Sequence, residues 1–222
     1  MVRRVTSQRA HVFVATSVAC DAQLRLYSGR VRHDAGGAIA TGARIALHRL
    51  GERLWVGLVH VDLPASVSPG DLVSYDLLLH EGSTTRGLHR LGLLGGDRGA
   101  VGPEHDPRRA AVPLGYEDGF LPAFVVPPAE PADLRLVHAS CRKPHGGAAD
   151  EADALQLLDA ELKRTTLTAI SLPDRPQQLV LTGDQIYADD VAGGLLQALT
   201  EAGEALLGWD EPFPAEIGRA HV

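Results

Sequence analysis

Near its C-terminal end the chain reads Gln178-Leu179-Val180-Leu181-Thr182-Gly183-Asp184-Gln185-Ile186-Tyr187-Ala188-Asp189-Asp190. The apolar run Leu179–Leu181 is typical of a parallel strand that is buried on both faces. Gly183 permits a sharp turn after the strand, so Asp184 should lie at the carboxyl edge of the sheet, where open α/β folds bind ligands. Asp184 and Tyr187 are three residues apart and can point toward one site, and hard metal ions prefer such oxygen ligands. The alternative is that Asp184 only caps the following helix.

A second strand-like run, Asp133–Lys143, contains a cysteine, Cys141, near its end. An amphipathic helix is predicted between the two runs, from Asp150 to Arg164, because leucines recur on one face and acidic side chains crowd the first turn. Strand, helix and strand within about 50 residues predict a βαβ unit with parallel strands. Parallel strands end at the same edge of a sheet. The pattern therefore predicts a metal site in which the Cys141 thiolate joins the Asp carboxylate and the Tyr phenol of the first stretch.

Together, the Ser140-Cys141 pair and the Gly183-Asp184-x-x-Tyr187 motif resemble the PhoD-like (alkaline phosphatase D) branch of the calcineurin-like metallophosphoesterases. Ordinary members of that superfamily carry Asp-x-His on the first strand, whereas the PhoD branch has a cysteine there and a tyrosine three residues after the Asp. The resemblance implies a site with Fe(3+) and Ca(2+), in which Cys141 and Tyr187 bind iron and Asp184 is shared between the metals; other divalent metals are alternatives. It is strong over residues 133–200 and weak over the N-terminal part.

This resemblance implies a hydrolase that acts on phosphomonoesters or phosphodiesters. The later metal ligands of the family, an Asn-His motif and further His and Asp residues, have no counterpart after Asp190. We therefore expect an N-terminal fragment that is inactive by itself, and no catalytic residue is assigned. The last seven residues, Glu216–Val222, match the translation of a short-read sequencing adapter and are interpreted as a sequencing or cloning remnant. Residues 133–215 would then be the start of the metallophosphatase domain.

Two further side chains are candidates for contact with the substrate. Arg142 and His145 follow the cysteine on the predicted ligand-binding edge and carry nitrogen donors that suit a phosphate group. The alternative is that both are solvated side chains at the rim of the site.

Residues 1–126 are predicted to form a β-sandwich of the immunoglobulin or fibronectin type, because short apolar runs alternate with turn signals. A hairpin turn is predicted at Leu50–Leu54, and a proline-rich linker at 127–132 joins the two parts. The candidate strands are Val12–Ala19, Leu24–Val31, Arg44–Leu50, Leu54–Val61, Leu72–His80 and Phe120–Val126.

Charge is unevenly distributed along the 222 residues. Residues 1–143 carry 17 basic and 14 acidic side chains, whereas residues 144–222 carry 4 and 14. An acidic C-terminal part argues against nucleic-acid binding, which requires a basic surface. No run approaches the length of a transmembrane helix, and no complete signal peptide is recognised, so a cytoplasmic location is expected.

The two cysteines, Cys20 and Cys141, lie in different predicted domains. A disulfide between them is therefore less favoured than a buried Cys20 and a metal-facing Cys141.

Two alternatives to this function remain open. The first is a non-catalytic β-sandwich binding module with a degenerate α/β appendage. The second is a two-metal phosphodiesterase or nucleotidase of the broader superfamily, which should carry Asp-x-His where this chain has Ser140-Cys141.

Overall fold

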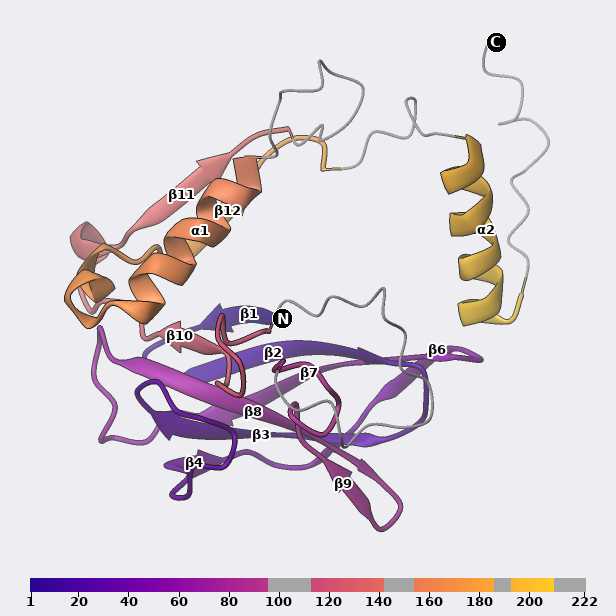
Figure 1. Cartoon of the computed structure of the whole chain (residues 1–222), viewed down its shortest axis with the longest axis horizontal. Coiled ribbons are helices and arrows are strands. Elements are labelled where there is room, and N and C mark those ends of the chain that lie inside the picture. The colour runs from indigo at the N-terminus through magenta and orange to yellow at the C-terminus, as the bar shows by residue number, and fades with distance from the viewer. Residues whose placement is uncertain (96–112, 142–153, 186–192, 210–222) are drawn as a thin grey trace.

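Antiparallel β-sheets make up most of the computed structural model, which describes residues 1–95, 113–141, 154–185 and 193–209. Two antiparallel sheets occupy the N-terminal part, and a small parallel sheet with two helices follows them in the chain (Figure 1).

The first antiparallel sheet has four strands in the order β1-β2-β7-β6. Its long central pair runs in continuous register from Arg9↔Asp62 to Thr16↔Trp55. Successive side chains of a strand point to opposite faces, and β2 accordingly buries Ala10, Val12 and Val14 on one face. The strands are β1 (Val2–Val5), β2 (Arg9–Thr16), β6 (His48–Gly51) and β7 (Leu54–Asp62).

The second antiparallel sheet follows the order β10-β8-β3-β4, with β5 pairing with β3 and β9 pairing with β8. Strand β3 buries Ala22, Leu24 and Leu26, and β8 buries Leu77 opposite Leu24 and Tyr75 opposite Leu26. The strands are β3 (Asp21–Ser28), β4 (Ala40–Thr41), β5 (Ile45–Ala46), β8 (Leu72–Glu81), β9 (Thr84–Arg86) and β10 (Ala123–Val125).

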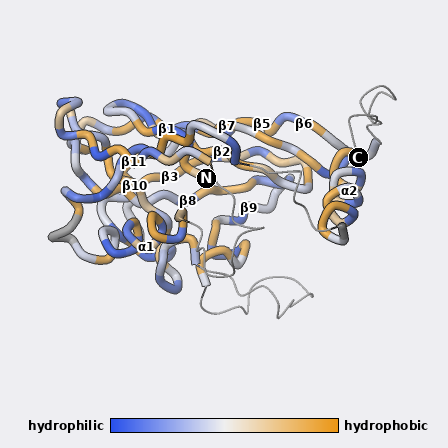
Figure 2. Tube along the Cα trace, turned by 90° about the horizontal axis from the view of Figure 1, so that it is seen from above, coloured by the Kyte–Doolittle hydropathy of each residue, from blue (hydrophilic) through white to orange (hydrophobic). Residues whose placement is uncertain are grey.

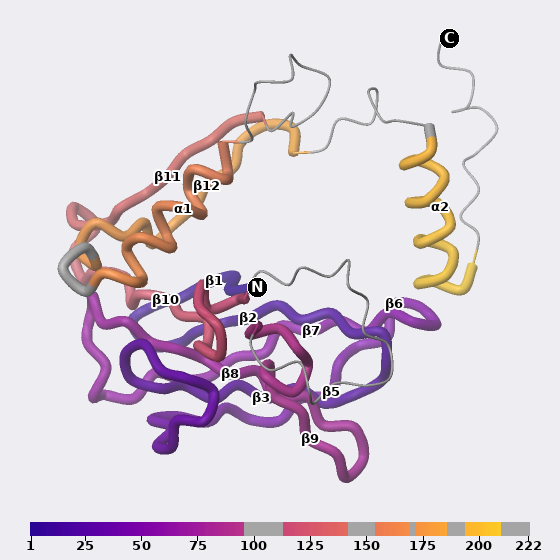
Figure 3. The backbone as a smooth tube through the Cα atoms, in the orientation of Figure 1, coloured from indigo at the N-terminus to yellow at the C-terminus, as the bar shows by residue number. Residues whose placement is uncertain are grey.

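The inner faces of these two sheets share one hydrophobic core. Val12 and Val59 come from the first sheet, and Leu24, Leu26 and Val73 come from the second; all are almost completely buried. Burial of each such side chain stabilises the fold by about 1.5–3 kcal/mol before the entropy of ordering is subtracted. The tube in Figure 3 shows the strands of both sheets stacked below the helices.

Five of the six strands expected from sequence are present in the N-terminal part, with ends that differ by up to three residues. The strand expected at Arg44–Leu50 is instead divided into β5, which pairs with β3, and β6, which pairs with β7 in the other sheet. The hairpin predicted at Leu50–Leu54 is confirmed, because β6 pairs antiparallel with β7 through Gly51↔Leu54. Sequence reasoning missed β1, β4 and β9, which are short strands at sheet edges or in a local hairpin. Strand β1 includes the Arg3-Arg4 pair and adds to the edge of the first sheet by pairing with β2.

The C-terminal part begins with a 3-10 turn (Pro131–Asp133) and continues through β11 (Leu136–Ala139), α1 (Ala154–Leu167), a second 3-10 segment (Ala169–Asp174) and β12 (Gln178–Leu181). Strands β11 and β12 pair in parallel, as predicted. Helix α1 half-buries Leu155, Leu158 and Leu162, the three leucines of the predicted apolar face, and ends three residues beyond Arg164.

The expected burial of β12 on both faces is wrong for the described residues. Leu179 and Leu181 are 42% and 38% exposed, and Leu136 of β11 is 49% exposed. A parallel sheet is normally covered by helices on both faces. Here the described part of the chain supplies only α1 beside a sheet of two strands, so the leucines keep much of their contact with solvent.

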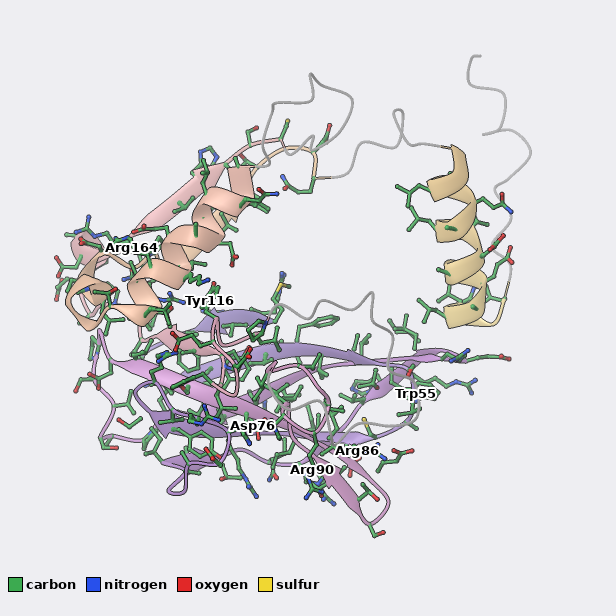
Figure 4. The ribbon with its side chains drawn as sticks, in the orientation of Figure 1. Trp55, Asp76, Arg86, Arg90, Tyr116 and Arg164 are labelled. Atoms are coloured by element: carbon green, nitrogen blue, oxygen red, sulfur yellow. The ribbon has the colours of Figure 1, made fainter. Side chains whose placement is uncertain are left out.

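Two polar contacts connect α1 to the antiparallel sheets. The Tyr116 hydroxyl donates to Asp159 Oδ1 of α1 at 3.0 Å, and Figure 4 shows Tyr116 between the helix and the sheets. Arg175 is buried and donates to the carbonyl oxygen of Leu162 at 2.6 Å and to that of Ala123 in β10 at 3.5 Å. Burial lowers the pKa of Arg175.

Helix α2 (Gly193–Leu207) lies apart from α1, next to the β6–β7 hairpin (Figures 1 and 3). Its last carbonyl groups accept hydrogen bonds from the hairpin backbone: Glu52 N donates to Leu207 O and Arg53 N donates to Leu206 O, both at 2.9 Å. Gly208, at φ 81°, ends the helix in the left-handed conformation common after helices.

The leucines of α2 are largely exposed: Leu195, Leu196 and Leu199 are 54–57% exposed and Leu206 is 40% exposed. Hydrophobic stretches recur along this helix at the surface of the molecule in Figure 2. Among the described helices, none combines the length and apolar character needed to span a bilayer.

Candidate metal-binding edge

Strands β11 and β12 end side by side. Their register runs from Leu136↔Gln178 to Ala139↔Leu181, and Thr182 N donates to Ala139 O at 2.9 Å just past the last pair. The residues that follow, Ser140-Cys141 on one strand and Gly183-Asp184 on the other, therefore lie at the same edge of the sheet. This is the placement that the parallel pairing predicts for Cys141 and Asp184.

Gly183 brings the two strand ends into direct contact. A Cβ atom at this position would lie 2.8 Å from Ser140 Oγ and 2.9 Å from Cys141 Sγ, closer than side-chain carbons normally approach such atoms. The glycine also has φ 141°, a value that side-chain-bearing residues rarely adopt. The absence of a side chain at 183 is what lets the Ser140 and Cys141 side chains occupy this space.

Polar side chains beside the glycine reinforce the contact between the strands. His138 of β11 lies 2.7 Å through Nε2 from Thr182 Oγ1. Ser140 Oγ lies 3.8 Å from Cys141 Sγ, within hydrogen-bonding reach of a sulfur acceptor.

Gln185 was not identified by sequence reasoning and contacts both strand ends. Its Nε2 donates to Ser140 O at 2.8 Å and to Gly183 O at 3.1 Å. No periodic or motif signal marks this residue, because its partners are backbone carbonyl groups that belong to segments about 40 residues apart along the chain.

The donor set at this edge fits part of a metal centre. Cys141 and Asp184 are both exposed, so a metal ion can reach the thiolate and the carboxylate. Within the described ranges no group of three or more His, Cys, Asp or Glu side chains is arranged to hold a metal ion. Two donors on adjacent strand ends fit the chemistry of a mixed sulfur and oxygen site, and further ligands would have to join them.

Three of the predicted site residues lie outside the described residues: Tyr187, the third proposed metal ligand, and Arg142 and His145, the two proposed phosphate contacts. Asp190 and the interval Glu216–Val222 lie outside them as well.

Cys20 is separate from this edge. It is partly buried against the core of the two antiparallel sheets, and burial is the main cause of the raised pKa of its thiol. Cys20 and Cys141 do not form a disulfide. Cys20 is therefore packed as the sequence suggested, although less completely buried than expected.

A cavity of about 660 Å³ lies at the opposite end of the parallel strands. Arg135 and Gln177, which precede β11 and β12, line it together with Val125, Val126 and Leu172. Two of its polar side chains are already engaged, since Arg135 pairs with Asp174 and Gln177 accepts from the Arg135 backbone. We therefore place the candidate site at the carboxyl edge and not in this cavity.

Comparison of the chain with protein-family models, with curated proteins and with solved structures gave no match.

Proposed function

We propose that the chain carries part of the metal site of a phosphoric ester hydrolase that resembles the PhoD-like metallophosphatases. In this proposal the two antiparallel sheets are an immunoglobulin- or fibronectin-like sandwich. The segment β11–α1–β12 is then the first βαβ unit of the metallophosphoesterase domain. The substrate would be a phosphomonoester or a phosphodiester.

One observation supports the proposal: a Cβ atom at Gly183 would lie 2.9 Å from Cys141 Sγ, so the cysteine side chain and the residue before Asp184 are in close contact. A glycine at 183, a cysteine at 141 and parallel strands in register are all needed for this contact. The motif on which the resemblance rests joins residues that are more than 40 positions apart. Their proximity at one strand edge is what a shared metal site requires.

In the proposed site Cys141 and Asp184 hold the metal, and Tyr187 is the third ligand of the proposal. A bound metal would supply Lewis acidity toward a phosphoryl oxygen and lower the pKa of a bound water molecule. The residues of this chain contribute the charge and position of the ligands: a thiolate and a carboxylate offset the charge of a trivalent or divalent ion.

The proposal is tested by metal binding to the purified chain, with Co(2+) as the probe. A thiolate ligand produces a charge-transfer absorption, which we expect in the wild type and not in Cys141→Ser. Asp184→Asn should retain the absorption but bind Co(2+) about 10–100-fold more weakly, because a charged ligand is lost. Cys20→Ser is the matched control and should behave like the wild type.

An absorption that survives Cys141→Ser, or that Cys20→Ser removes, would contradict the proposed site. Hydrolysis of a generic phosphate ester by the wild type and by Asp184→Ala gives a second test. We expect equal, near-background rates, because the family's later ligands have no counterpart in this sequence. Turnover that Asp184→Ala abolishes would support the function and refute the expectation that the chain is inactive by itself.

A further inference from the structure

The Gln185 side chain crosses from one strand end to the other. Its amide nitrogen donates to Ser140 O at 2.8 Å and to Gly183 O at 3.1 Å. Both distances are normal for hydrogen bonds from an amide N–H to a carbonyl oxygen. One NH₂ group has two hydrogens and can satisfy both acceptors at once.

The orientation of this amide is set by its surroundings. If its oxygen and nitrogen were exchanged, the oxygen would face two carbonyl oxygens and be repelled by both. The observed Oε1 atom is buried and has no hydrogen-bond partner in the part of the chain that the structure describes. Leaving such an acceptor unsatisfied is unfavourable, and the two hydrogen bonds from Nε2 offset this cost.

Both acceptors immediately precede a proposed metal ligand. The carbonyl group of Ser140 belongs to the peptide unit that continues into Cys141, and that of Gly183 belongs to the peptide unit that continues into Asp184. Peptide units are planar and rigid. A single side chain that holds both carbonyl groups therefore constrains the orientation of the backbone at both ligands.

Strand pairing alone does not provide this constraint. Among the backbone hydrogen bonds between described residues of the two strands, the one from Thr182 N to Ala139 O lies nearest to Cys141 and Asp184. Beyond it, Gln185 supplies the next polar link between the two segments.

We propose that Gln185 is a positioning residue that holds Cys141 and Asp184 in register for metal binding. This inference rests on the proposed function, because it assumes that these two residues are metal ligands. Gln185 itself need not contact the metal. Its role is to reduce the motion of the two backbone segments, which lowers the entropy lost when a metal ion is bound.

The test compares Gln185→Met with the wild type. Methionine has about the length of glutamine but no N–H donor, so it removes both hydrogen bonds with little change in volume. We expect Co(2+) to bind about tenfold more weakly, a typical effect of losing support for metal ligands, and the thiolate charge-transfer absorption to shift or weaken. Gln178→Met, at an exposed position at the other end of β12, is the matched control and should bind Co(2+) like the wild type.

A second readout does not depend on metal. Amide hydrogen exchange at Cys141 and Asp184 should accelerate in Gln185→Met and stay unchanged in Gln178→Met. Wild-type affinity and absorption in Gln185→Met would overturn the positioning role while leaving the proposed function standing. Absence of a Cys141-dependent absorption in the wild type would instead refute the proposed function and, with it, this role in metal binding. The exchange rates would then show only whether Gln185 orders the strand ends.

Discussion

At the scale of single residues, Gly183 is the position at which the candidate site tolerates least change. Gly183→Ala would place a methyl group 2.8–2.9 Å from Ser140 Oγ and Cys141 Sγ and 3.2 Å from Cys141 N, at an unfavourable φ of 141°. We expect the local stability of the β11–β12 pair to fall by about 1–3 kcal/mol, as overpacking usually causes, and Co(2+) affinity to fall with it. Amide hydrogen exchange of the two strands and Co(2+) titration measure these effects.

Gly194→Ala is the comparison for that substitution. A Cβ atom at Gly194 in α2 meets nothing within 4 Å, and alanine favours a helix over glycine by about 0.5–1 kcal/mol. The same chemical change should therefore be neutral or stabilising at 194. Equal effects at the two positions would show that the contact between the strand ends is not tight in solution.

Two neighbouring histidines make stability depend on pH. The rings of His33 and His89 stack with centroids 3.5 Å apart. Burial, and then the charge of His33, lower the pKa of His89 below its ordinary value of 6.5. The unfolded chain thus binds this proton more readily than the folded chain. The contribution of neutral His89 is fully present above about pH 6.5 and is lost as the pH falls through its lower folded-state pKa.

We therefore expect the free energy of unfolding to decline on acidification below about pH 6.5, and His89→Gln to make that decline shallower. Urea unfolding across this pH range measures the slope. His48→Gln replaces an exposed histidine of β6 and should leave the slope unchanged. A slope that is identical in His89→Gln and the wild type would show that the stacked pair does not contribute.

At the scale of elements, Arg175 is a buried polar connection between α1 and the antiparallel sheets. Its hydrogen-bond partners in the described residues are neutral: the carbonyl oxygens of Leu162 and Ala123 and the hydroxyls of Thr165 and Thr166. Carbonyl groups near the end of a helix carry partial negative charge and favour a cation there. A buried arginine can therefore be accommodated without a carboxylate.

Arg175→Met should reduce the free energy of unfolding by about 2–4 kcal/mol, because it leaves several buried acceptors without a donor. Arg135→Met is the control, since Arg135 pairs with Asp174 at 3.4 Å in an exposed ion pair, and such pairs contribute about 0–1 kcal/mol. Urea unfolding of both variants measures the difference. Similar losses in the two variants would contradict the role assigned to the buried arginine.

At the scale of the whole molecule, exposed apolar side chains gather on two elements in particular, among others that are scattered over the described surface. Leucines line the surface of α2, and others lie on the two-stranded parallel sheet, where Leu136, Leu179 and Leu181 are exposed. Exposed apolar surface of this kind promotes association. The chain should therefore self-associate as its concentration rises.

Replacing Leu196 and Leu199 of α2 together by glutamine should lower this self-association, as measured by sedimentation velocity over a range of concentrations. Glutamine keeps a high helix propensity, so α2 should persist. Thr200→Gln, an exposed polar position on the same helix, is the control and should not change the association. If the double substitution leaves the association unchanged, the chains associate through a surface other than that of α2.

Local sequence patterns predicted the larger strands well and the short ones poorly. In β2 and β3 an apolar residue recurs at every second position, which is a strong signal for a half-buried strand. Strands β7 and β8 are recognised instead as runs of nine and ten residues that are rich in apolar side chains. Strands of two to four residues such as β4, β9 and β1 have too few positions for any periodicity to be recognised. Their pairing depends on neighbours that a local pattern does not contain.

Part of the candidate site could likewise be predicted from the sequence, and part could not. Cys141 and Asp184 were predicted to lie at one sheet edge because parallel strands joined by a helix must end together, and the register of β11 and β12 agrees with this. The role of Gln185 was not predictable, since it depends on two backbone carbonyl groups whose positions follow from the turn of each strand end.

By itself the sequence determined where most strands and helix α1 lie, because hydrophobic periodicity, glycines and helix-end charges act over neighbouring residues. Only the tertiary structure decided which side chains are buried. Leu179 and Leu181 look like core residues in sequence but remain exposed, and Arg175 looks like a surface residue but is buried at the end of α1. Burial depends on what other segments pack against a residue, and that information is distributed over the whole chain.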